Sequence, residues 1–181
     1  PIKSSAASDV YKRQIVSGTK VCEALREKGH KAILADVCFG LEGVGAEEAF
    51  SETYDVEAAA AYMRSFDIQA ERAASEKREF FGPQVLALCK AADIVFMALH
   101  GENGENGKIQ AAFDLFGIRY TGTGYLGSAL AMNKGMAKQL FLENGIPTPR
   151  GTSLKRGEDA AKIETCGIHF PCVVKPCSGG S

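Results

Sequence analysis

The segment HGENGENG, residues 100–107, gathers three glycines, two glutamates and two asparagines behind one histidine, directly after the apolar run DIVFMAL. In open α/β sheets, ligands bind at the carboxyl ends of strands, where glycines let backbone N–H groups approach them. A histidine can donate a hydrogen bond to a carboxylate, and a glutamate can hold an ammonium group. The segment therefore suits a zwitterionic ligand better than a phosphate, because two glutamates would repel a phosphate.

A purely structural interpretation of the same segment stays open. Gly104 and Gly107 can simply make turns, and Glu105 can cap the helix that follows. His100 is then an ordinary loop histidine with satisfied hydrogen bonds. The G-x-G-x-x-G spacing of dinucleotide-binding loops is absent, which argues against a dinucleotide site.

A second stretch with chemical potential is VVKPCSGGS, in which Lys175 ends an apolar run and a small polar loop follows. An ammonium group followed by backbone and hydroxyl donors makes a phosphate clamp. The donors would be Ser178, Gly179, Gly180 and Ser181. In the Walker pattern the lysine follows the glycines, so this is a different arrangement, and a solvent-exposed Lys175 is the alternative. Lys134, in AMNKGMAK, is uninformative alone because helix surfaces commonly carry lysines.

Alternating helices and strands must position these residues. Apolar periodicity predicts helices over 17–28, 56–66, 82–93, 107–117, 123–133, 134–145 and 157–167. Gly29 and Gly117 are expected to end two of them, since glycine favours the left-handed conformation at a helix C-terminus. Strands are expected over 31–37, 93–99, 118–122 and 170–176, and those over 93–99 and 170–176 are expected to be buried. Residues 41–82 contain no motif that we can interpret apart from their helix.

The strand over 93–99 is nearly all apolar instead of alternating, which predicts a parallel sheet covered on both faces. The fold class is therefore α/β. A proline-bounded linker, IPTPRG, precedes what we interpret as a new unit. Residues 1–14 are polar and do not join smoothly to the first helix, so we interpret them as a non-native scar. We also expect the chain to be incomplete at both ends.

Composition excludes several classes of function. The chain of 181 residues is 45% hydrophobic and 24% charged, with a net charge of -1, so it has no footprint for nucleic acid or an anionic membrane. No apolar run approaches the roughly 18–20 residues of a membrane helix. Six cysteines without a C-x-x-C pair indicate reduced thiols in a cytoplasmic protein, without a structural zinc site.

Three segments, HGENGENGKIQAAF, GIRYTGTGYLGSALAMNKGMAKQLF and FPCVVKPCSGGS, occur in this order and spacing. Together they resemble the amino-terminal half of a D-alanine–D-alanine ligase of the ATP-grasp superfamily. The resemblance runs over about residues 16–181, is strong from residue 92 onward and is weak over 41–82. Asn106 stands where the family signature H-G-x-x-G-E-D-G has an aspartate, which puts the hydrogen bonds of that carboxylate in question.

The resemblance implies a Rossmann-like, pre-ATP-grasp domain over 15–132 and the beginning of an ATP-grasp domain over 133–181. It implies that ATP phosphorylates the carboxylate of one D-alanine and that the amine of a second D-alanine attacks the acyl phosphate. His100 would lie beside the first D-alanine, and Glu105 would order that pocket. Lys134 and Lys175 would hold ATP phosphates, with the glycine-rich loop that follows. Ser181 would lie near the substrate and the transferred phosphate.

The resemblance also implies Mg2+ or Mn2+, with ligands expected after Ser181 and none in this chain, a role in peptidoglycan synthesis, and a homodimer. We expect the chain alone to be inactive. One alternative keeps the chemistry and uses D-lactate or D-serine as the second substrate. Another is a non-catalytic α/β domain that binds an amino acid. A third is a different ATP-grasp enzyme, such as a carboxylase, which would lack the histidine segment.

Overall fold

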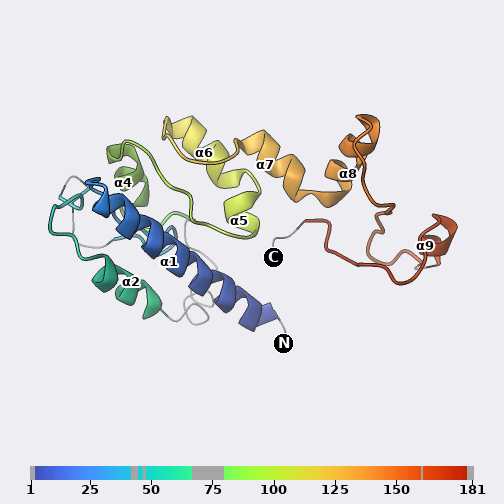
Figure 1. Cartoon of the computed structure of the whole chain (residues 1–181), viewed down its shortest axis with the longest axis horizontal. Helices are drawn as coiled ribbons and strands as arrows, with labels where there is room; N and C mark the ends of the chain where they lie inside the picture. Colours follow the sequence, from blue (N-terminus) through green and yellow to red (C-terminus); the bar gives the residue numbers. More distant parts are fainter. Residues whose placement is uncertain (1–2, 42–44, 47, 67–79, 160, 179–181) are drawn as a thin grey trace. The chain divides into compact units, whose positions relative to one another are not determined.

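The computed structural model describes residues 3–41, 45–46, 48–66, 80–159 and 161–178 (Figure 1). The chain forms two compact units, and each is described by itself. The first unit comprises Pro1–His100 and Ala112–Gly122, and the second comprises Gly101–Ala111 and Thr123–Ser181. Gly179, Gly180 and Ser181, which we assigned to the phosphate loop and the substrate, lie outside the described residues.

The first unit is built on the long helix α1 (Lys3–Glu27). This helix includes all but the last residue of the helix predicted over 17–28, and it begins well before that range. It ends as predicted at Gly29, whose φ of 85° places it in the left-handed region, where glycine is not strained. The N–H of His30 donates to the carbonyl of Leu25 across 3.1 Å, which closes the last turn of the helix.

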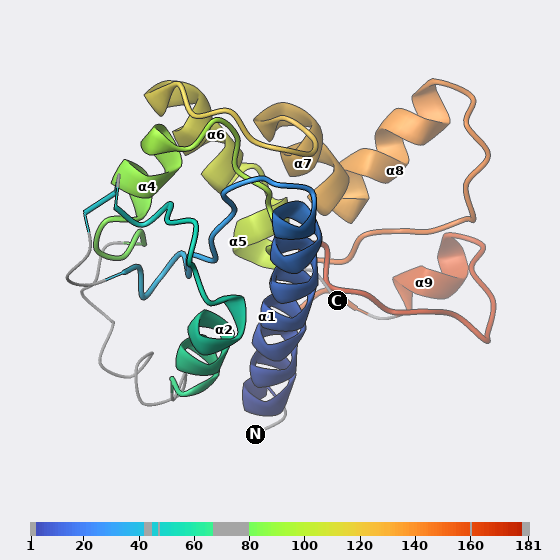
Figure 2. The same cartoon turned by 60° about the vertical axis from the view of Figure 1, so that its left-hand side comes forward.

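Helix α2 (Val56–Arg64) lies beside α1 (Figure 1, Figure 2). Asp55 caps it, because the Asp55 carboxylate accepts a hydrogen bond from the N–H of Ala58. The two helices share an apolar core, formed by Ile15, Cys22, Leu34, Ala60 and Met63. Tyr11 is packed against that core, so part of the segment that we interpret as a scar contacts the fold.

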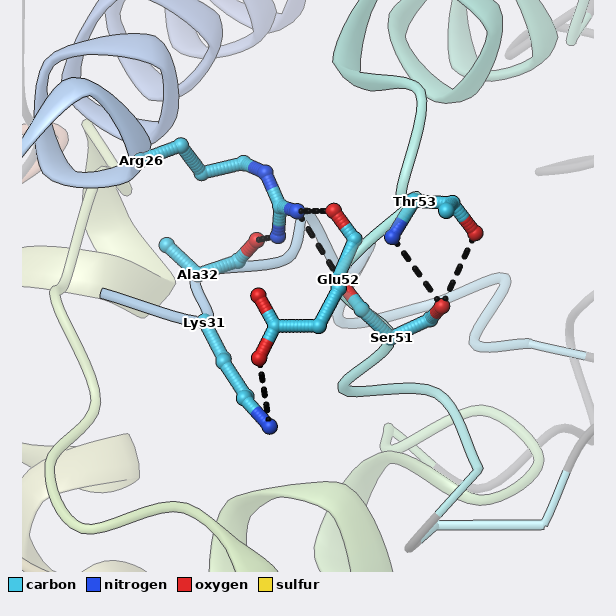
Figure 3. Close-up of polar contacts among 6 residues, drawn as sticks. All are labelled: Arg26, Lys31, Ala32, Ser51, Glu52 and Thr53. Atoms are coloured by element: carbon cyan, nitrogen blue, oxygen red, sulfur yellow. Dashed lines mark hydrogen bonds and ion pairs between the residues drawn. The ribbon is translucent and has the colours of Figure 1, made fainter. Parts of the chain in front are cut away.

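Arg26, in the last turn of α1, fastens two loops of the first unit to the helix (Figure 3). Its guanidinium donates to three backbone carbonyls, those of Ala32, Ser51 and Glu52, at 2.9, 3.1 and 2.6 Å. Lys31 forms an ion pair with the Glu52 side chain at 2.8 Å, and this contact lowers the pKa of that carboxyl group. These contacts hold the chain after α1 close to the helix end.

The predicted strands are represented by one parallel pair, Val95 with Tyr120. The N–H of Val95 donates to Arg119 across 2.8 Å, and the N–H of Thr121 donates to Val95 across 2.9 Å. This pair joins the segments predicted as strands over 93–99 and 118–122, in the predicted parallel direction. Nowhere else in the described ranges do residues form a β pair, so the Rossmann-like sheet is not confirmed and stays a prediction.

Burial of the apolar strands was predicted wrongly. Ile94 and Phe96 are 58% and 50% exposed, and Val173 and Val174 are 80% and 84% exposed. Strands of a parallel sheet are buried only when neighbouring strands and covering helices are present. The described part of the chain supplies one short pairing for the first strand and none for the second, so these side chains remain uncovered.

The remaining helices of the first unit agree with the predicted pattern. Helix α4 (Val85–Ala91) lies within the helix predicted over 82–93. Helix α6 (Lys108–Phe116) begins in the second unit and ends in the first. Gly117 follows it with a φ of 66°, as predicted, and the N–H of Ile118 donates to the carbonyl of Phe113 across 2.9 Å.

The described residues of the second unit form four further helices, α5 (Glu102–Glu105), α7 (Tyr125–Met132), α8 (Lys134–Glu143) and α9 (Lys162–Thr165). Helices α7 and α8 confirm the predictions over 123–133 and 134–145. The helix predicted over 157–167 is reduced to the single turn of α9. Every described helix is too short or too polar to cross a membrane.

Candidate functional site

The glycine-rich segment folds back on itself as the one-turn helix α5. Gly101 precedes it with a φ of 87°, a conformation that favours glycine. A carboxylate oxygen of Glu105 accepts a hydrogen bond from the N–H of Gly101 across 2.8 Å, and the N–H of Glu105 donates to the Gly101 carbonyl across 3.0 Å. The alternative that Glu105 caps the following helix is therefore wrong, because its carboxylate caps α5 instead.

His100, the first residue of the segment HGENGENG, belongs to the first unit, whereas the rest of the segment belongs to the second. The His100 side chain is exposed. Its carbonyl oxygen accepts a hydrogen bond from the side-chain amide of Gln14 across 2.7 Å. The histidine backbone is thus fixed to α1. Glu105, Lys134 and Lys175 belong to the second unit.

The Asn106 side chain contacts the backbone at the start of α6. Its side-chain oxygen accepts a hydrogen bond from the N–H of Lys108 across 3.1 Å. An aspartate at this position could accept the same bond, since both side chains present an oxygen at the same distance from the backbone. The departure from the family signature therefore keeps the hydrogen bond and removes a negative charge beside a helix N-terminus.

Gly107 sets how closely the glycine-rich segment packs on α7. It is buried with a φ of 87°, and a Cβ atom there would lie 2.3 Å from the carbonyl oxygen of Tyr125. No side chain fits such an approach between two backbones. The glycine therefore fixes the segment against the first turn of α7.

The two lysine motifs, far apart in sequence, meet in the second unit. The backbone N–H of Lys134 donates to the carbonyl of Cys177 across 2.9 Å. The Cys177 thiol donates to the side-chain oxygen of Asn133 across 3.1 Å, over a sequence separation of 44 residues. The loop after Lys175 is thereby joined to the N-terminal end of α8. Lys175 and Ser178 are exposed, and the Lys134 side chain is half-buried.

Sequence reasoning missed two residues that organise these segments. Asn133 caps α8 by accepting from the N–H of Met136, and an asparagine before a helix was a usable signal for this. Gln110 is 6% exposed and donates through its amide nitrogen to the carbonyl of Gly104 across 2.8 Å. No sequence signal marked it. Within the described ranges, no group of three or more acidic, histidine or cysteine side chains could hold a metal ion.

Comparison with known proteins decides the family. Residues 13–123 match the model of the family described as the D-ala D-ala ligase N-terminus. The chain belongs to this family. The resemblance to D-alanine–D-alanine ligases is thereby confirmed for their amino-terminal portion.

Curated relatives of this ligase family extend the match beyond residue 123. A D-alanine–D-alanine ligase of Lacticaseibacillus casei is 44% identical over 172 residues, which cover 92% of this chain and 47% of the relative. A D-alanine–D-alanine ligase of Pediococcus pentosaceus is 40% identical over 177 residues, covering 91% and 48% respectively. The chain spans about half the length of the curated relatives that it matches.

A solved structure supports the ligase fold. The crystal structure of VanG D-Ala:D-Ser ligase from Enterococcus faecalis matches with a TM-score of 0.50 and 29% sequence identity. The match covers 71% of this chain and 39% of that one.

Proposed function

We propose that the full-length protein, meaning this chain extended to the length of its relatives, joins two D-alanines into D-alanyl-D-alanine at the expense of ATP. The observation that carries the proposal is the hydrogen bond between Lys134 and Cys177, which joins the two lysine motifs. Membership of the D-alanine–D-alanine ligase family supports it. The product would serve peptidoglycan synthesis, and the reaction would take place in the cytoplasm.

The proposed reaction has two steps. The carboxylate of the first D-alanine attacks the γ-phosphorus of ATP, and ADP leaves with the electron pair of the broken bond. The amine of the second D-alanine then attacks the resulting acyl phosphate, and the tetrahedral intermediate expels phosphate. Such a reaction depends mainly on positioning and on neutralising the charge of the phosphates.

The residues of this chain have distinct parts in that scheme. His100 would donate a hydrogen bond to the first D-alanine, and Glu105 would hold the segment around it by its bond to Gly101. Lys134 and Lys175 would place positive charge on the ATP phosphates. Ser178, Gly179 and Gly180 would add hydroxyl and backbone donors, and Ser181 would lie near the transferred phosphate.

ATP fits this arrangement because cationic side chains and the N-terminal end of a helix dipole suit a polyphosphate. Lys175 is exposed, and the loop after it contacts the N-terminal end of α8, which has ten residues. Mg2+ or Mn2+ would neutralise further phosphate charge, with ligands that we place after Ser181. The full-length protein would also form a homodimer.

One alternative has an observation in its favour. The similar structure from Enterococcus faecalis is that of a D-Ala:D-Ser ligase, so D-serine as the second substrate is the second candidate. D-lactate would require the same first step and an oxygen nucleophile in the second. Most residues that contact a second substrate would lie outside this chain.

The test is ADP release by the purified full-length protein, with identification of the product by mass spectrometry. We expect ADP release that depends on D-alanine and yields the dipeptide. A product dominated by D-alanyl-D-serine or a depsipeptide would exclude D-alanine as the preferred second substrate. D-alanine binding without ATP-induced protection from proteolysis would indicate a binding domain, and ATP turnover that depends on bicarbonate would indicate a carboxylase.

A further inference from the structure

Gln110 is a buried amide whose two ends have different surroundings. It lies in the first turn of α6 beside Ile109, and the two residues are 6% and 2% exposed. Its amide nitrogen donates to the carbonyl of Gly104 across 2.8 Å. Its amide oxygen is buried and, among the described residues, accepts no hydrogen bond. The side chain is therefore only half satisfied.

A half-satisfied buried amide is a poor way to stabilise a fold. An unpartnered buried oxygen loses its hydration without compensation. A methionine has nearly the same length and shape and would avoid that cost. The glutamine supplies a hydrogen bond to Gly104, which a methionine would not. We therefore look for the role of Gln110 in this hydrogen bond.

Gly104 is the buried residue of α5, the single turn that carries Glu105. An isolated turn of helix is not stable by itself, because it gains too few hydrogen bonds for the backbone that it orders. Among the described residues, two side-chain hydrogen bonds hold this turn. Glu105 fastens it to Gly101 across 2.8 Å, and Gln110 fastens it to α6 across 2.8 Å.

We propose that Gln110 is a positioning residue, which acts through the Gly104 carbonyl to hold α5 and Glu105 in the geometry that the amino-acid substrate requires. It does not touch the substrate. This inference rests on the proposed function, because it takes the α5 segment to be the amino-acid site.

The first readout measures the α5 segment without activity. In the full-length protein, Gln110→Met should make the Gly101 amide exchange its hydrogen about fivefold faster, because the turn that carries its Glu105 acceptor is less restrained. The amides of α8 should exchange at unchanged rates. Gln139→Met is the matched control, since Gln139 is an exposed glutamine of α8. It should leave the Gly101 amide unaffected.

The second readout separates the two substrates. Gln110→Met should raise the KM for the first D-alanine about tenfold and change the KM for ATP by less than about twofold. Gln139→Met should change neither. A merely structural role would lower the amount of folded enzyme and leave both KM values as they are.

Each outcome decides a stated point. Faster exchange at Gly101 together with the selective rise in KM supports the proposal. Unchanged exchange at Gly101 overturns it, as does a Gln110→Met protein that fails to fold, because the glutamine would then serve the fold. Faster exchange with unchanged KM also overturns it, because α5 would be held without consequence for the substrate. Failure of the proposed function is recognised separately, by wild-type protein that releases no ADP with D-alanine.

Discussion

The backbone N–H of Lys134 donates to the carbonyl of Cys177 across 2.9 Å. This bond joins the N-terminal end of α8 to the loop that follows Lys175. A phosphate group near this junction would meet the charge of lysines from two separate motifs, together with the N-terminal end of a helix dipole. The predictions about nucleotide binding follow from this relationship.

Lys175→Ala in the full-length protein should weaken ATP binding at least about tenfold, because a charge-assisted contact to phosphate is lost from a site that depends on charge. The affinity for D-alanine should change much less. Calorimetric titration with ATP measures the first effect. Lys155→Ala is the control, since Lys155 is another exposed lysine of the same unit. Unaltered ATP affinity in Lys175→Ala would refute the assigned role.

His100→Ala should have the opposite selectivity. We expect the KM for the first D-alanine to rise about tenfold, with a smaller change for ATP, because a hydrogen bond to the amino-acid carboxylate is removed. The backbone of residue 100 should stay in place, since Gln14 binds its carbonyl oxygen and not its side chain. His169→Ala, at another exposed histidine, is the control. An unchanged dependence on D-alanine would leave His100 with a structural role only.

Asn106 allows a test of the departure from the family signature. Asn106→Asp should keep the hydrogen bond to Lys108 and stabilise the protein by about 0.3–1 kcal/mol, because a negative charge is added beside the N-terminus of α6. Asn106→Ala should instead cost about 1 kcal/mol, since the bond is lost. Urea unfolding compares the three proteins. Equal stability of the asparagine and alanine proteins would show that the bond contributes nothing.

The local features of the fold could be predicted from the sequence. Gly29 and Gly117 end α1 and α6 as expected, because the conformation at a helix C-terminus depends on the residue itself. The environment of Ile94 and Val173 was predicted wrongly, because burial of a strand depends on neighbours far away in the sequence.

The candidate site shows the same division. The segment HGENGENG was recognised from residue types, whereas its internal bonds were not. The contact between the side chains of Asn133 and Cys177 joins residues 44 positions apart, so no local sequence pattern could predict it. The hydrogen bond from Gln110 to Gly104 could not be found from periodicity either, because a buried glutamine occupies a position where apolar residues are expected.

Arg26 should matter more for stability than its neighbour Lys31. Arg26→Met removes three hydrogen bonds to backbone carbonyls and should lower the free energy of unfolding by about 1–3 kcal/mol. Lys31→Met removes only an ion pair between two exposed side chains and should have a much smaller effect. Lys31 lowers the pKa of Glu52 in the folded protein, so what the pair contributes is present near neutral pH and is lost as the pH falls. Urea unfolding of both variants at neutral and acidic pH measures this, and equal losses at neutral pH would contradict it.

The cysteines report on both burial and nucleotide binding. Burial raises the pKa of the Cys22 and Cys89 thiols, so iodoacetamide should modify them much more slowly than the exposed Cys177. In the full-length protein, ATP should slow modification of Cys177 at least about fivefold, because this residue lies two positions after Lys175 in the proposed phosphate loop. The exposed Cys166 is the internal control and should react at the same rate with and without ATP. Mass spectrometry of the modified peptides follows all four cysteines, with and without ATP, in one experiment. If ATP protected Cys166 and Cys177 equally, the effect would be a general tightening of the protein, and the phosphates would have to be bound elsewhere.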